Sequence, residues 1–224
     1  MRRATPAQAP LERPGPLVAI QRGLESLYRI ETHVDISDFL LTAEQQAQLS
    51  PNRRPPEQLL LHEHADGLDL ALYLEASLLR TLTQHDPREG INGRNLPALL
   101  LVIEGVSHFV YAVDRARNRR SLSALELELQ AEVDKYVVLV LLLWKQGAPG
   151  ELIDLLFRQV AYRPDLSPEE RTRYAAANAA ALCYAEALHR RYLRAQALLG
   201  FLTDVRRFWR LSLSGKLSHI NIGL

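Results

Sequence analysis

The chain has 224 residues, of which 47% are hydrophobic, with 27 Lys and Arg against 26 Asp and Glu. This balance is ordinary for a globular protein and excludes a strong overall field for polyanions, so any electrostatic function requires local segregation of charge. The single cysteine, Cys183, excludes an internal disulfide. No apolar segment of a secretory signal follows the first residues, and the longest apolar run, residues 136–144, is too short to span a bilayer.

We therefore expect a cytoplasmic protein that makes no membrane contact. The abundance of Ala, Leu and Arg favours a bacterial source. Residues 1–16 contain four prolines and almost no bulky apolar side chain, which predicts a flexible tail. Length favours a single globular domain over 17–224.

The first elements differ in their periodicity. Apolar residues at helical spacing predict a helix over 17–28, and alternation over 30–36 predicts a strand. Thr42, with Gln45 three residues later, forms a capping box that begins a short helix ending near Leu49.

A β-hairpin is the clearest local pattern. Two alternating segments, 59–65 and 68–74, flank Asp66-Gly67, a preferred two-residue turn. Counting from that turn places His64 opposite Asp69. One face then carries only leucines, namely Leu59, Leu61, Leu68, Leu70, Leu72 and Leu74. We expect helices to cover this face and 30–36 to add a third strand.

The remaining chain reads as helices. Apolar spacing and caps predict helices over about 97–117, 123–146, 151–160, 168–199 and 201–211, with Gly147-Ala-Pro-Gly150 as a break. Ser123 and Glu126 form a second capping box, and Ser167-Pro-Glu-Glu170 begins the fourth of these helices. The predicted class is mainly α (α+β). A hairpin-containing part spans 17–83, a helical part 96–211 and a C-terminal tail 212–224.

The helices 97–117 and 123–146 should pack antiparallel because their connection is short. The second helix has two apolar seams on nearly opposite sides, which indicates a helix sandwiched between neighbours. Two acidic seams lie between them, one of Glu128 and Glu132 with Lys135, the other of Glu126, Gln130 and Asp134. At least one should be partly buried.

Folding the pair about residue 120 places His108 near Glu132, and Glu104 near Lys135. Glu104, His108, Glu128 and Glu132 then form a candidate divalent-metal or acid–base site. The alternatives are a structural network in which these groups satisfy one another, and two solvated faces. No cofactor is required by any motif.

His62 and His64 share a strand face with Asp69. Two strand histidines and a carboxylate suit zinc with an open position. The same face carries Leu60, Ala71 and Tyr73, as an ordinary half-exposed sheet surface would.

The C-terminal part is basic. Its candidate partner surface consists of Arg190, Arg191, Arg194, Arg206, Arg207, Arg210 and Trp209. Arginines beside aromatic residues suit an acidic or apolar protein partner, or nucleic acid. Arginines near helix C-termini also simply favour the helix dipole.

Phosphate-binding glycine loops and nucleophile elbows are absent from the sequence. Cys183 lies among alanines and reads as a small core residue. We therefore favour a non-enzymatic adaptor that binds a protein partner through its C-terminal half. A metal-dependent enzyme and a nucleic-acid-binding protein are the alternatives, and a homo-oligomer is compatible with each.

Overall fold

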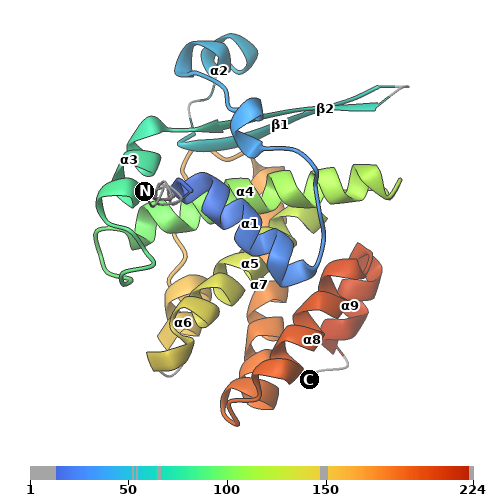
Figure 1. Cartoon of the computed structure of the whole chain (residues 1–224). Helices are drawn as coiled ribbons and strands as arrows, with labels where there is room; N and C mark the ends of the chain where they lie inside the picture. The colour runs from blue at the N-terminus through green and yellow to red at the C-terminus, as the bar shows by residue number, and fades with distance from the viewer. Residues whose placement is uncertain (1–13, 52, 54, 65–66, 147–150, 222–224) are drawn as a thin grey trace, which may run out of the picture.

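The computed structural model describes residues 14–51, 53, 55–64, 67–146 and 151–221 (Figure 1). Most of the expected tail, Asp66 of the expected turn and the expected break at 147–150 lie outside these residues. Within the described part, most elements are helices and one two-stranded antiparallel sheet lies at the edge of the molecule, which confirms the mainly α class with a small β-hairpin.

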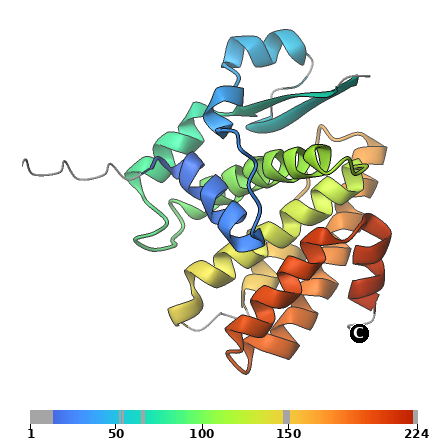
Figure 2. The same cartoon turned by 45° about the vertical axis from the view of Figure 1, so that its right-hand side comes forward.

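The centre of the fold is an antiparallel pair, α4 (Leu96–Arg117) and α5 (Ala124–Leu142), with α7 (Pro168–Leu188) against α5 (Figures 1 and 2). The sandwiched position predicted from the two apolar seams of α5 is therefore confirmed. Although α4 is long and apolar enough to cross a membrane, 72% of its apolar window is buried inside the protein. That is the position of a core helix.

The N-terminal elements cover α4. Helices α1 (Pro16–Tyr28) and α3 (Ala76–Gln84) pack against it, and the sequence pattern did not predict α3. The short helix α2 (Ala43–Leu49) begins with the predicted capping box: Thr42 Oγ1 accepts from the Gln45 amide at 3.2 Å, and Gln45 Oε1 accepts from the Thr42 amide at 2.8 Å.

The predicted third strand over 30–36 is wrong. This segment is a loop that ends in a 3-10 helix, Ile36–Phe39. Its backbone is bonded by α1: Gln21 Nε2 donates to the Val34 carbonyl at 2.7 Å, and Gln21 Oε1 accepts from the Ile36 amide at 3.0 Å. Because His33 also has a positive φ of 59°, the segment cannot run as a regular strand. The chain meets the sheet only after this segment, where Leu40 forms an isolated bridge to Leu72.

The hairpin consists of β1 (Glu57–His64) and β2 (Gly67–Leu74). Its register is shifted by two residues from the prediction, so that His62 lies opposite Asp69 and His64 opposite Gly67. A shift of two leaves each side chain on its expected face, because the period of a strand is two. The leucine pattern therefore predicted the face correctly, but the register predicted from an Asp66-Gly67 turn was wrong.

The leucine face is only partly covered. Leu72 and Leu74 are buried near α4, whereas Leu61, toward the tip, is 40% exposed. Figure 2 shows the hairpin extending over α4, with the beginning of α7 below it. This incomplete cover leaves apolar side chains facing a cleft.

The C-terminal region departs from the predicted boundaries. After α6 (Glu151–Ile153) a π-helix follows over Asp154–Arg158, and Trp144–Gln146 extends α5 as a 3-10 turn. Helix α7 has the predicted Ser167 cap and capping box, but it does not reach 199. It ends at Leu188 and continues as a π-helix over His189–Leu193.

Two helices complete the chain, α8 (Leu198–Arg210) and α9 (Leu213–Asn221). The break before α8 is at Gln196, whose φ is 51°. Gly200, which falls between the predicted helices 168–199 and 201–211, lies within α8, where a Cβ would be 2.8 Å from the ring of Tyr192. Helix α9 replaces most of the C-terminal tail predicted over 212–224.

Candidate functional site

A cleft of about 490 Å³ opens between the hairpin, α4, α5 and the beginning of α7. Its apolar walls include Leu59 and Leu61 of β1, Leu127 of α5 and Val160 of the connection to α7. Its charged floor consists of Glu57, Glu104, His108, Glu128, Glu132, Lys135 and Arg173. Apolar walls with a few convergent polar groups are typical of small-molecule sites.

Helical spacing directs the floor residues into this space. Glu104 and His108 are four residues apart on α4, and Glu128 and Glu132 have the same spacing on α5, so each pair shares one face. Gly105 lets β1 approach α4. A Cβ at this position would lie 3.0 Å from Cγ of Glu57 and 3.1 Å from Cδ2 of Leu74.

One half of the floor is a closed ion-pair group. Lys135 Nζ donates to Glu104 Oε2 at 3.1 Å, as expected, and to Glu132 Oε1 at 2.7 Å. Burial favours the neutral form of the lysine, but the two carboxylates outweigh it and raise the pKa of Lys135. Burial likewise raises the pKa of Glu104, yet Lys135 and His108 hold that pKa below its ordinary value. For Glu132 burial prevails, and its pKa is raised.

The other half centres on His108, which pairs with Glu128 and Glu57 rather than with Glu132. Its Nε2 lies 3.4 Å from Glu128 Oε2, and its Nδ1 lies 3.6 Å from Glu57 Oε1. Burial lowers the pKa of the imidazole, but the two carboxylates outweigh burial and raise it well above 6.5. Arg173 Nε approaches the other oxygen of Glu128 at 3.5 Å.

These last contacts are close enough for ion pairs but lack hydrogen-bond geometry. Glu57 Oε1, His108 Nε2 and Arg173 Nε are buried atoms with no hydrogen-bond partner. The side chains of Glu57 and His108 are each only 9% exposed. Buried polar atoms are normally bonded, so three such atoms around one space indicate a place for a further molecule.

The arrangement does not present a ready-made metal centre. Among the residues that the structure describes, no three His, Cys, Asp or Glu side chains form a group that could hold a metal ion. Lys135 occupies the position between Glu104 and Glu132 that a bridging cation would need. The predicted set of Glu104, His108, Glu128 and Glu132 therefore lines one cleft, but as two ion-paired groups.

Sequence reasoning missed Glu57 and Arg173. The observed β1 begins two residues before the predicted strand, so Glu57 was assigned to no element. Arg173 lies on α7, four residues after Glu169, in a helical turn whose sequence looks exposed. Only the packing of α7 on α5 brings Arg173 close to Glu128. The one signal for Glu57 in the sequence was the strand period of two. Continued backward from Leu59, this period places residue 57 on the leucine face.

The hairpin histidines lie apart from the cleft. His62, His64 and Asp69 are exposed, and His64 Nε2 lies 3.5 Å from Asp69 Oδ1 although His62 is the residue directly opposite. The rings of His62 and His64 are 6.3 Å apart. This is an ordinary exposed pair on a sheet surface, and zinc binding here stays a prediction.

The expected basic surface is divided by the fold. Trp209 is buried and stacks on Tyr28 with ring centroids 4.0 Å apart. Arg206 Nε donates to the Leu27 carbonyl at 2.6 Å, and an Arg210 nitrogen donates to the Tyr28 carbonyl at 3.1 Å. These two arginines thus bond the C-terminal carbonyls of α1, as cations at a helix end do.

The other arginines of this set lie around the turn from α7 to α8. Arg191 pairs with Asp204 at 3.6 Å, and Arg190, Arg194 and Arg207 are exposed. A protein or nucleic-acid partner at this reduced surface stays a prediction.

A second buried charged group lies on the opposite acidic seam of α5. Asp134 accepts from Ser107 Oγ at 2.5 Å, from Gln130 Nε2 at 2.9 Å and from the Tyr28 hydroxyl. Burial raises the pKa of Asp134 to about 6, although these donors oppose the shift.

Lys216, in the segment expected as a tail, completes this group. Its Nζ is fully buried and donates to Gln130 Oε1 at 2.6 Å and to the Tyr111 hydroxyl at 2.7 Å. Tyr111 in turn donates to Glu126 Oε1 at 2.6 Å, which also accepts from Arg115 at 2.9 Å. Burial lowers the pKa of Lys216 well below its ordinary value. The group contains two acids and two bases and joins α1, α4, α5 and α9.

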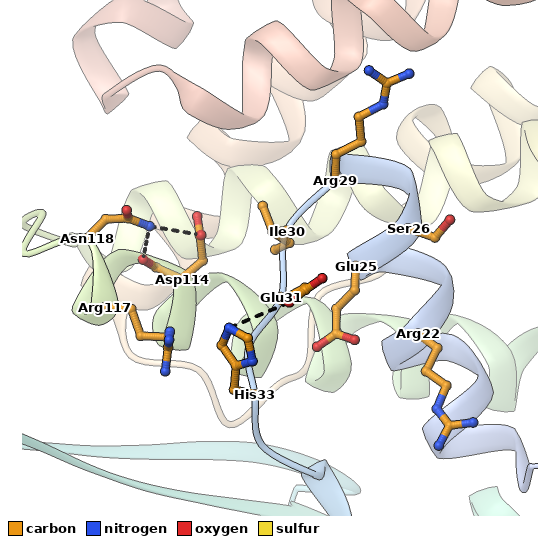
Figure 3. Close-up of a pocket in the computed structure, with 10 residues that line it drawn as sticks. All are labelled: Arg22, Glu25, Ser26, Arg29, Ile30, Glu31, His33, Asp114, Arg117 and Asn118. Carbon is orange, nitrogen blue, oxygen red and sulfur yellow. Dashed lines mark hydrogen bonds and ion pairs between the residues drawn. The ribbon is translucent and has the colours of Figure 1, made fainter.

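A wide groove of about 1050 Å³ lies between the ends of α1 and α4 (Figure 3). Its carboxylates are largely engaged within the fold: Glu31 pairs with His33 at 3.7 Å, and Asp114 accepts from Asn118 at 3.0 Å. In Figure 3 the guanidinium of Arg29 points away from the other residues that line the groove. These side chains do not converge on one point, so we assign the groove no site.

Comparison with known proteins adds no assignment. No model of a protein family matches the chain, and no curated protein or solved structure matches it. Any proposal therefore depends on the chemistry of the cleft.

Proposed function

We propose that this protein binds a small molecule in the cleft between β1, α4, α5 and α7. The observation that carries the proposal is the convergence of three buried, unbonded polar atoms on one concave space. They are Glu57 Oε1, His108 Nε2 and Arg173 Nε. Leaving such atoms unpaired costs about 1–3 kcal/mol each, so a fold retains them where a ligand or solvent completes the bonds.

The walls suit a molecule with an apolar body. Leu59, Leu61 and Val160 face the cleft from its rim, and both leucines belong to the face that the helices leave partly uncovered. A polar head group at the floor would reach Glu57 and His108 while the body packs on these side chains. Burial of apolar area contributes about 25 cal/mol per Å² to such binding.

Acid–base chemistry is compatible with this proposal. The neighbouring carboxylates of Glu128 and Glu57 raise the pKa of His108, which favours its protonated form, and the imidazole lines the cleft where a bound head group would lie. A metal-dependent enzyme is the less favoured reading, because the ammonium of Lys135 already bridges two of the carboxylates.

A thermal-shift screen with a panel of small cations, anions and neutral molecules tests the proposal. Ala124 is exposed and lines the cleft, so Ala124→Phe should fill part of it. Ala116→Phe places the same ring on an exposed position of α4 outside the lining and serves as the matched control. We expect at least one class of molecule to raise the unfolding midpoint of the wild type and of Ala116→Phe, but not of Ala124→Phe. Equal shifts in both variants, or no shift with any class, would contradict the proposal.

A further inference from the structure

The charges of the cleft floor do not balance. Four carboxylates, those of Glu57, Glu104, Glu128 and Glu132, face two permanent cations, Lys135 and Arg173. His108 supplies a third cation when protonated. One carboxylate is therefore left without a cation of its own, even with the imidazole charged.

The groups at the mouth of the cleft do not compensate this surplus of negative charge. Arg53 pairs with Glu170 at 2.5 Å, and Arg163 pairs with Asp165 at 2.5 Å, so each of these pairs is neutral. Tyr162 and Tyr174 line the same mouth. Burial raises the pKa of both tyrosines, so they are uncharged at neutral pH.

Lys135 faces two carboxylates, Glu104 and Glu132, whereas Glu57 and Glu128 together face His108 and Arg173. The carboxylate of the floor with an unmet acceptor is Glu57. Its Oε1 is buried and has no hydrogen-bond donor, and its one near cation, the His108 imidazole, is shared with Glu128. Burial also raises the pKa of Glu57 against the opposing effect of His108. A proton or an incoming cation would neutralise this carboxylate.

From the net negative floor and the unbonded oxygen of Glu57, we infer that the ligand of the cleft is an organic ammonium with an apolar body, whose charged nitrogen donates to Glu57; this inference rests on the proposed function. The apolar rim of Leu59, Leu61 and Val160 accommodates the body. Tyr162 and Tyr174 add aromatic rings, which attract cations, and the guanidinium of Arg173 already lies 5.6 Å from the centre of the Tyr174 ring. A bare metal ion would use none of these wall residues, and a carboxylate ligand would have to compete with Glu128 for His108 and Arg173.

Isothermal titration with three isosteric probes tests this inference: hexylammonium, hexanol and hexanoate. We expect hexylammonium to bind the wild type, and hexanol and hexanoate to bind at least tenfold more weakly. In Glu57→Gln the affinity for hexylammonium should fall at least tenfold. In Glu63→Gln, which removes an exposed carboxylate from the same strand, it should be unchanged.

The outcomes separate this inference from the proposal beneath it. Tighter binding of hexanol or hexanoate that Ala124→Phe abolishes would overturn the ammonium while supporting a small-molecule cleft. Binding of Mn²⁺ alone, with no heat from hexylammonium, would overturn it in favour of a metal. Equal affinity of Glu57→Gln and the wild type for hexylammonium would also overturn it. No binding of any probe, together with no shift in the thermal screen, would contradict both.

Discussion

The two acidic seams of α5 are both buried, yet they are completed in different ways. The seam of Glu126, Gln130 and Asp134 meets Arg115 and Lys216 through hydrogen bonds of ordinary length, and its acids and bases are equal in number. The seam of Glu128 and Glu132 faces a cleft, where acids outnumber bases. The first arrangement holds helices together and leaves one of its buried atoms, Arg115 Nε, without a partner. The second leaves three such atoms, Glu57 Oε1, His108 Nε2 and Arg173 Nε, and they line an open space.

This difference separates buried charge that stabilises a fold from buried charge kept for another purpose. A balanced network in a water-free interior is costly to break, because each remaining partner loses its bond. An unbalanced group reduces stability until something binds it. Proteins commonly accept such a cost at functional sites. Five predictions test the contrast.

The largest effect on stability is expected for a substitution at Asp134. Asp134→Ala removes the acceptor of Tyr28, Ser107 and Gln130 and lowers the free energy of unfolding by about 3–5 kcal/mol. Urea unfolding followed by circular dichroism measures the change. Asp69→Ala, at an exposed carboxylate of the hairpin, is the control and should leave stability nearly unchanged. A loss at Asp134 no larger than at Asp69 would remove the distinction between the seams.

Lys216 should have the next largest effect. Lys216→Met keeps the length of the side chain but leaves Gln130 Oε1 without this donor and the Tyr111 hydroxyl with Arg115 as its remaining donor, at a cost of about 1–3 kcal/mol. Lys216 and His219 are both polar anchors of α9, since His219 Nε2 lies 2.7 Å from Asp204 Oδ1. Loss of the Lys216 anchor should also make the variant easier to cleave near residue 216 by a protease. Unchanged cleavage and stability would show that Lys216 is not needed to hold α9.

The pH dependence of stability reports on His108. The folded pKa of this histidine lies above its unfolded value of 6.5, so its contribution is fully present below pH 6.5 and is lost as pH rises through the folded pKa. Relative to His108→Gln, the wild type should lose at most about 1.4 kcal/mol per pH unit on that rise. Parallel stability curves for the two proteins from pH 6 to 9 would show that the Glu57 and Glu128 contacts do not hold the proton.

A smaller effect is expected at Gly105. In Gly105→Ala the new Cβ crowds Glu57 and Leu74, while helix propensity improves by about 1 kcal/mol, so net stability should change by less than that amount. The displaced Glu57 should bind hexylammonium more weakly. Gly23→Ala, at a helical glycine with open space around it, is the matched control for propensity. Equal binding by the two variants would show that the close approach of β1 is unimportant for the site.

Much of the helical framework was predictable from the sequence, because it depends on local patterns. The spacing of apolar residues located α4 and α5, Thr42 and Ser167 fixed two helix starts, and the paired seams of α5 predicted its sandwiched position. The Ser123–Glu126 box formed only in part. Ser123 caps the Glu126 amide, but the Glu126 side chain bonds Arg115 and Tyr111 instead.

The predictions were wrong where the local structure depends on residues that are distant in the sequence. The alternation over 30–36 gave no sign that Gln21 would bond its backbone. The candidate site was half predicted: Glu104 meets Lys135 as expected, but the partners of His108 come from β1 and a neighbouring position on α5. The burial of Lys216 could not be predicted from the sequence, because a lone lysine in a Ser- and Gly-rich segment is normally exposed to solvent.

The unfolding free energy of Glu57→Gln, compared with that of the wild type in the absence of ligand, tests most directly whether Glu57 is part of a structural network. If Glu57 is a buried carboxylate that lacks a hydrogen-bond donor, its neutral isostere should be as stable as the wild type or more stable by up to about 1 kcal/mol. A loss of more than about 1 kcal/mol would show that Glu57 belongs to a balanced structural network. In that case the cleft would be built in the same way as the seam around Asp134.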